Sequence, residues 1–258
     1  MRVPYCLIAT ASAAAFALGA PAPAAADEAG YLYTYAVDSS RYQDVFAQFD
    51  AYKPLGASTP VRPLLDLFVS RDEKTGTRAN VPLILSDNYV LAAAGLQYTN
   101  GKGLRAFVEG GASEKFGPIA ALSSGGDVRG GIQFYRDWGT GPTYRHAWGS
   151  IYASTVYYSR YSDWILYSQG EAVAALASPR HPFEPFLRAV VNLDTQRHYY
   201  SNLAEAGAGI RYHPFGRKGP GLEAMFVQGV YLRNTVRPAG QGTTYTDFRP
   251  AINYGTNL

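Results

Sequence analysis

The sequence predicts an all-β fold, an antiparallel transmembrane β-barrel of about twelve strands, with ten strands as the fallback. Three observations support this prediction: side chains alternate in character with a period of two, no long apolar run follows residue 26, and tyrosine is abundant while charge is scarce. A period of two is the strand period, because successive side chains point to opposite faces. A membrane helix needs about 20 consecutive apolar residues, so insertion of this chain into a membrane must use closed strands.

The alternation is clearest between Phe183 and Pro214, a stretch that we interpret as two strands joined by a polar turn. In the first strand the polar face carries Glu184, Arg188, Asn192 and Asp194. In the second strand it carries Glu205, Gly207, Gly209, Arg211 and His213. The opposite face of both strands is apolar. In an outer-membrane barrel the apolar face meets lipid and the polar face meets the lumen, whereas in a soluble sandwich a second sheet covers the apolar face.

The first 26 residues have the features of a secretory signal peptide. One early positive charge, Arg2, precedes an apolar run to Leu18, and small residues lead to a cleavage site expected after Ala26. The single cysteine, Cys6, lies inside this segment, so the expected mature chain contains no disulfide. We therefore expect a signal peptide over residues 1–26 and a single barrel domain over residues 27–258.

Alternating segments recur along the rest of the chain, and the first of them is the weakest. The expected strands are 31–37, 42–53, 61–71, 89–99, 104–114, 127–137, 148–160, 164–176, 183–194, 204–213, 222–234 and 244–258. Turn residues separate several of them, notably Pro54 to Pro60 and the Asn100-Gly101-Lys102 signal. Loops are expected at 72–87, 115–126 and 235–243. Bacterial single-chain barrels have even strand numbers, which favours twelve.

Composition supports a membrane location and argues against nucleic acid as a partner. Tyrosine accounts for 21 of the 258 residues, and 17% of residues are charged, against a usual share of about 25%. Tyrosine suits a water–lipid boundary, so we expect interfacial belts. One belt is expected around Tyr157, Tyr158, Tyr161, Trp164 and Tyr167. The net charge of +3 is weak and dispersed, which is not typical of nucleic-acid binding.

Nine charged side chains on the polar strand faces are expected to point into the lumen. They are Arg105, Glu109, Asp127, Arg129, Glu184, Arg188, Asp194, Glu205 and Arg211. A twelve-strand barrel is only modestly wider than an eight-strand barrel, whose interior is filled by side chains, so opposite charges would pair across it. These pairs either fill and stabilise the barrel or line a narrow polar channel. The first interpretation is favoured because unpaired buried charges are costly.

No catalytic or metal site is expected. The four histidines, at 146, 181, 198 and 213, lack zinc-site spacing, and no cofactor is implied. His198, Ser201 and Asn202 match the residue types of outer-membrane phospholipases, but positions 198 and 201 differ in parity and lie in an expected turn. We expect a protein that is not an enzyme. A lipid-modifying hydrolase and a periplasmic sugar-binding β-sandwich are the alternatives.

Several short motifs resemble the C-terminal domain of the bacteriophage adsorption protein A family. They are Glu205 to Gly216, Ser86 to Asn88, Phe107 to Gly111, Phe134 to Trp138, Ser150 to Ala153, Tyr157 to Trp164 and Tyr245 to Arg249, so the likeness spans roughly residues 80 to 258. The resemblance implies an outer-membrane β-barrel that phages use as a receptor and that is associated with exopolysaccharide secretion. The expected partners are outer-membrane lipids and, by this resemblance, a phage or a polysaccharide-secretion system.

Overall fold

The protein is a closed antiparallel β-barrel of twelve strands, which confirms the predicted fold class and strand number. The computed structural model describes residues 30–41, 44–56, 59–74, 87–120, 123–139, 147–174, 182–197, 202–216, 219–232 and 242–257. The strands are β1 (Tyr31–Ser39), β2 (Asp44–Pro54), β3 (Val61–Lys74), β4 (Asp87–Thr99), β5 (Leu104–Ala120), β6 (Gly125–Trp138), β7 (Ala147–Tyr158), β8 (Asp163–Ala174), β9 (Phe183–Asp194), β10 (Leu203–Tyr212), β11 (Gly221–Tyr231) and β12 (Thr244–Asn257). The expected signal peptide lies outside the described residues.

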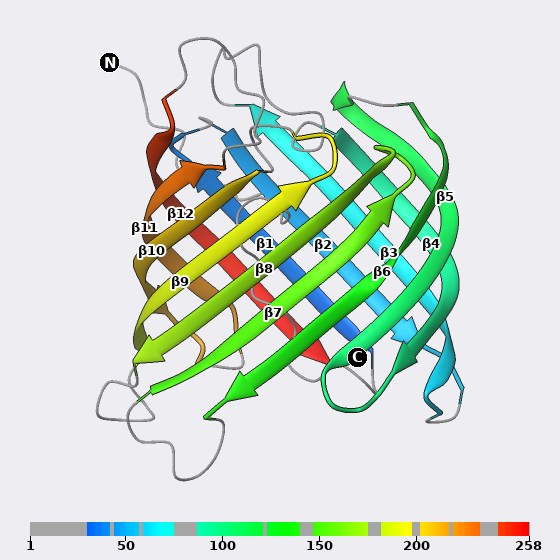
Figure 1. Ribbon diagram of the computed structural model, residues 1–258, viewed down its shortest axis with the longest axis horizontal. Helices are drawn as coiled ribbons and strands as arrows, with labels where there is room; N and C mark the ends of the chain where they lie inside the picture. The colour runs from blue at the N-terminus through cyan, green and yellow to red at the C-terminus, as the bar shows by residue number, and fades with distance from the viewer. Residues whose placement is uncertain are drawn as a thin grey trace.

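Each strand pairs with its neighbours in sequence, and β1 pairs with β12 to close the barrel (Figure 1). At this seam Tyr31 lies opposite Asn257, and Val37 lies opposite Ala251. Because the strand number is even, β1 begins and β12 ends at the same rim, which we call the proximal end. The turns that follow odd-numbered strands lie at the opposite rim, the distal end, which is uppermost in Figure 1. The single closed sheet excludes a β-sandwich.

The connection that differs most from the prediction is the one at residues 115–126, while the predicted loop at 72–87 is shortened at both ends by β3 and β4. Residues 115–126 were expected to form a loop, but β5 continues to Ala120 and β6 begins at Gly125. The reason is pairing: Lys115 lies opposite Tyr89 and Ala120 lies opposite Asp87, so β4 extends the ladder beyond the point where the side chains become polar. The alternating sequence pattern therefore ends where polar side chains begin, but the paired strand β5 continues beyond that point.

Most charged side chains of the strands point into the barrel, and its outer wall is largely apolar. In β9 the even-numbered side chains Glu184, Arg188 and Asn192 are buried, while Leu187 and Val191 are exposed on the outer wall. The same alternation recurs in β8 and β11. No helix among the described residues is long and apolar enough to cross a membrane.

Two glycines on the inward face of β10 make room for large neighbours. A Cβ on Gly209 would lie 2.6 Å from Cζ of Phe186, and a Cβ on Gly207 would lie 3.1 Å from the sulfur of Met225. Glycine in a strand is typical of places where other groups approach the backbone closely. The phenyl ring of Phe186 therefore packs over a strand that offers no side chain at that position.

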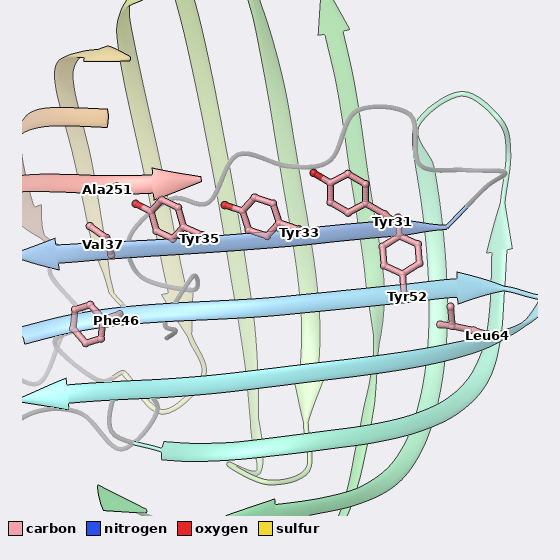
Figure 2. Close-up of a cluster of buried hydrophobic side chains, with 8 residues drawn as sticks. All are labelled: Tyr31, Tyr33, Tyr35, Val37, Phe46, Tyr52, Leu64 and Ala251. Atoms are coloured by element: carbon pink, nitrogen blue, oxygen red, sulfur yellow. The ribbon is translucent and has the colours of Figure 1, made fainter. Parts of the chain in front are cut away.

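Much of the tyrosine lies inside the barrel. The rings of Tyr31, Tyr33 and Tyr35 follow one another along the inner face of β1, with centroids 6.2 and 6.4 Å apart, as Figure 2 shows. Tyr158 and Tyr167 are also buried, so their predicted place in an interfacial belt is wrong. Alternation explains this, because Tyr157 and Tyr158 are adjacent and must point to opposite faces. Buried tyrosines help to fill the lumen.

Candidate functional site in the barrel interior

All nine charged residues named from the sequence lie on inward-facing strand positions. Eight of them are buried, and Arg105 is half-buried. The structure separates them into local groups along the barrel and adds partners that the sequence did not single out. These groups, rather than a single cleft, form the candidate functional site.

The first group joins β8, β9, β10 and β11 in the proximal half of the barrel, and we call it the proximal network. Nη2 of Arg188 lies 2.6 Å from Oε2 of Glu171 and 3.0 Å from Oε2 of Glu223. Arg211 contacts the same two carboxylates, with Nη2 2.9 Å from Oε1 of Glu171 and Nε 2.6 Å from Oε1 of Glu223. Two guanidinium groups thus bridge two carboxylates in a ring. Buried charges are stabilised only when paired and hydrogen-bonded in this way.

The proximal network extends to the rim of the barrel. Nε2 of His213 lies 3.1 Å from Oε2 of Glu184, and Nη1 of Arg211 lies 3.7 Å from the same oxygen. On the other side, Nδ2 of Asn253 donates to Oε1 of Glu223 at 2.6 Å. The network therefore spans five consecutive strands, from β8 to β12.

The second group lies toward the distal end, and we call it the distal network. Arg249 donates two hydrogen bonds to Glu205, of 2.8 and 2.6 Å, and a third of 2.7 Å to Asp247. Asp247 also accepts hydrogen bonds of 2.9 Å from the hydroxyls of Ser39 and Ser40 and from the backbone N–H of Arg41. The distal network therefore fastens the β1–β2 turn to β12.

A third group includes Asp127 and Arg129 of β6. Nε of Arg129 lies 3.7 Å from Oδ2 of Asp127, and Nη2 donates to the hydroxyl of Tyr89 at 2.7 Å. The guanidinium also stacks over the ring of Phe68, 4.3 Å from its centroid. Asp127 in turn accepts a 2.9 Å hydrogen bond from Ser159 of the β7–β8 turn. This group ties the wall to a distal turn.

Arg105 of β5 has different partners. Arg105 donates to amide oxygens, at 3.0 Å to Gln97 and 2.8 Å to Gln133, and its guanidinium lies 4.3 Å from the ring centroid of Tyr52. Glu109 is buried on the same strand. The expectation that opposite charges pair across the lumen is wrong for the ion pairs described here, because those of the proximal and distal networks join residues of one strand or of strands no more than two apart on the same wall.

Asp194 is held by Asn202, one of the three residues weighed as a catalytic set. Nδ2 of Asn202 donates to Oδ1 of Asp194 at 2.9 Å, and the backbone N–H of Asp194 donates to Oδ1 of Asn202 at 3.4 Å. The amide thereby ties together the two ends of the β9–β10 turn. His198 and Ser201 lie outside the described residues.

Sequence reasoning missed the main partners in both networks, namely Glu171, Glu223, Asp247 and Arg249. Each lies on the inward parity of an expected strand, so alternation contains a signal for its direction. The alternation does not identify which residue each inward side chain pairs with. Arg211 of β10 reaches Glu171 of β8 across β9, and such a pairing depends on the register of three strands.

Within the described part of the chain, no three histidine, cysteine, aspartate or glutamate side chains are grouped so that they could hold a metal ion. The described contacts of the networks are ion pairs and hydrogen bonds between side chains, with one hydrogen bond from the backbone N–H of Arg41 to Asp247.

No protein-family model and no curated protein matches the chain. Among solved structures, the chain is similar to a NanC porin, with 10% identity, 86% of this chain and 98% of that chain covered, and a TM-score of 0.40. It is similar to the beta domain of the Bordetella autotransporter BrkA, with 12% identity, coverage of 88% and 98%, and a TM-score of 0.41. A bacterial polysaccharide outer membrane secretin matches at 9% identity, with coverage of 90% and 99% and a TM-score of 0.37.

Proposed function

We propose that this chain is an outer-membrane β-barrel that acts without catalysis. The observation that carries the outer-membrane part of this proposal is the inverted burial of the wall. Outward side chains such as Leu187 and Phe226 are 62% and 70% exposed, while the inward Arg188 is 3% exposed. An apolar outer wall of this extent is unfavourable in water and favourable in lipid, where a closed barrel also satisfies every strand edge.

The even strand number supports an orientation. In bacterial barrels both chain ends face the periplasm, so we place the proximal end there and the distal end at the cell surface. The partners along the outer wall are then the outer-membrane lipids.

The resemblance to the phage-adsorption family supports a role for the distal rim in recognition. The motif Tyr157 to Trp164 forms the end of β7, the β7–β8 turn and the start of β8 at that rim. Gln196 donates to the carbonyl oxygen of Tyr161 at 2.9 Å, and Thr195 donates to Asp163 at 2.6 Å, so this turn is tied to the next distal turn. A pre-organised rim lowers the entropic cost of binding a phage protein or a surface polysaccharide. We propose this rim as the contact surface for either partner.

Cell fractionation with and without an alkaline carbonate wash tests the location. We expect the protein to stay in the outer-membrane fraction and to migrate differently on a gel before and after heating, because closed barrels resist unfolding in detergent. Recovery in the soluble periplasmic fraction would contradict the proposal. Labelling of Ser162→Cys on intact cells tests the orientation, since this exposed turn residue lies at the distal rim.

A further inference from the structure

The β1–β2 turn at the distal end places an arginine in a cage of aromatic and acidic side chains. Cζ of Arg41 lies 3.5 Å from the ring centroid of Tyr245 and 4.9 Å from that of Tyr231. Nη2 of Arg41 donates to the hydroxyl of Tyr231, and Nη1 lies 4.0 Å from Oε1 of Glu205. The side chains of Arg41 and Glu205 are 8% and 2% exposed. A cation over two electron-rich ring faces and beside a carboxylate is held in the geometry of a cation–π site.

The cage is fixed by the wall and not by Arg41. Glu205 is oriented by two hydrogen bonds from Arg249 and one from the hydroxyl of Tyr245. The rings of Tyr231 and Tyr245 lie 5.1 Å apart. Tyr245 lies opposite Gly229, where an added Cβ would collide with its ring, so the glycine provides the space that the ring occupies. All three cage residues therefore belong to strands β10, β11 and β12.

Arg41, in contrast, belongs to a turn. It follows the last residue of β1 by two positions, and its own backbone N–H and the hydroxyl of Ser40 are fastened to Asp247. Rotation of the Arg41 side chain out of the cage would break its contacts with Tyr231, Tyr245 and Glu205 and leave these attachments in place. The cage lies where β11 ends and β12 begins, at the distal rim.

We propose that Tyr231, Tyr245 and Glu205 form a cation-binding site at the distal mouth, that Arg41 occupies it as an internal ligand, and that it accepts an external guanidinium group when Arg41 is withdrawn. The internal occupant defines the ligand class, which is a planar organic cation such as an arginine side chain of a partner. The inference goes beyond the proposed function and does not depend on the membrane location.

Chemical rescue tests the site. The full chain is refolded in detergent as wild type, as Arg41→Ala and as Arg41→Ala/Tyr245→Leu, and the midpoint of the heat-induced gel shift is measured. We expect low millimolar ethylguanidinium chloride to raise the midpoint of Arg41→Ala and to leave the other two proteins unchanged. Sodium chloride at the same concentration controls for ionic strength. Equal shifts in all three proteins, or no shift in Arg41→Ala, would overturn the proposal.

The test also covers a variant that fails to fold. If Arg41→Ala gives no heat-modifiable form in buffer, its refolding yield becomes the measurement. The proposal then requires ethylguanidinium to restore the yield of Arg41→Ala while sodium chloride does not. Failure of ethylguanidinium to restore it would count against the site.

A labelling experiment tests the charge preference of the cage. In a Cys6→Ser background, Arg41→Cys is treated with methanethiosulfonate reagents that carry a trimethylammonium or a sulfonate group. Ser123→Cys, an exposed turn residue at the same rim, corrects for the intrinsic rates. We expect the corrected rate to be about tenfold higher for the cationic reagent, and this preference to fall when Tyr245→Leu is added. Equal corrected rates would contradict a cation site.

Discussion

Buried arginines in this barrel are stabilised from two directions, by carboxylates and by aromatic rings. Arg188 contacts Glu171 and Glu223 with its nitrogens, and its guanidinium lies 4.8 Å from the ring centroid of Phe186. A guanidinium is planar and weakly hydrated, so it can accept a ring on its face while its edge donates to carboxylates. Lysine lacks this combination, which explains why arginine is the buried cation in these networks.

The proximal network predicts a large effect of a single substitution. Arg188→Leu leaves Glu171 and Glu223 sharing Arg211 alone, so we expect a loss of about 3–5 kcal/mol in the free energy of unfolding. Urea unfolding in lipid vesicles, followed by tryptophan fluorescence, measures it. The matched control is Arg197→Asn, an exposed turn position with φ of 64° that asparagine also adopts. Its expected change is within about 0.5 kcal/mol. Similar losses in both variants would show that the network is not the cause.

The hydrolase alternative is tested at residues 198 and 201. We expect Ser201→Ala and His198→Ala to leave any lipid acyl release unchanged, because the third member of the set, Asn202, is engaged with Asp194 in joining two strand ends. The measurement is release of labelled fatty acid from outer-membrane lipids. A drop of roughly a hundredfold or more in either variant would establish a nucleophile or base there.

At the scale of the element, the two faces of β10 respond differently to added volume. On the inward face the added Cβ of Gly209→Val would lie 2.6 Å from Cζ of Phe186 and 2.6 Å from the backbone oxygen of Ala224. We expect a loss of about 1–3 kcal/mol from overpacking. Ala208→Val, one residue away on the exposed outer face, is the control and is expected to change little. The same urea titration distinguishes them. A greater loss for Ala208→Val would reverse the assignment of the faces.

The strands show which features of the fold can be predicted from the sequence and which cannot. Alternation located twelve strands and the inward direction of residues such as Glu184 and Arg211, because the strand period is local. It failed at 115–126, where pairing with β4 continues a strand whose polar side chains resemble a loop. It also did not assign partners, since the Arg249–Glu205 contact joins β12 and β10 across β11. Arg41 has no periodic signal because it lies in a turn.

At the scale of the whole molecule, the wall separates two environments, and cysteine substitutions on adjacent residues report on them. In a Cys6→Ser background, Ala206→Cys on the outer face should resist a charged, water-soluble thiol reagent in intact membranes and react with an apolar, lipid-dissolved one. Gly207→Cys on the inner face should resist both, because its Cβ position lies 3.1 Å from the sulfur of Met225. Fast labelling of both positions by the charged reagent would mean that β10 is not part of a membrane wall.

The seam between β1 and β12 sets the order of events during folding. The contacts that close it join residues more than 200 positions apart, such as Ser39 and Asp247. Until β12 has paired with both neighbours, β1 and β11 are unpaired edge strands that can pair with other chains. The entropic cost of closing this long loop is then not yet balanced by the contacts of the seam. We therefore expect barrel closure to be slow and to compete with association between chains, which increases with concentration. Weakening the hydrogen bonds of Asp247 is expected to increase aggregation during assembly before it affects the finished barrel.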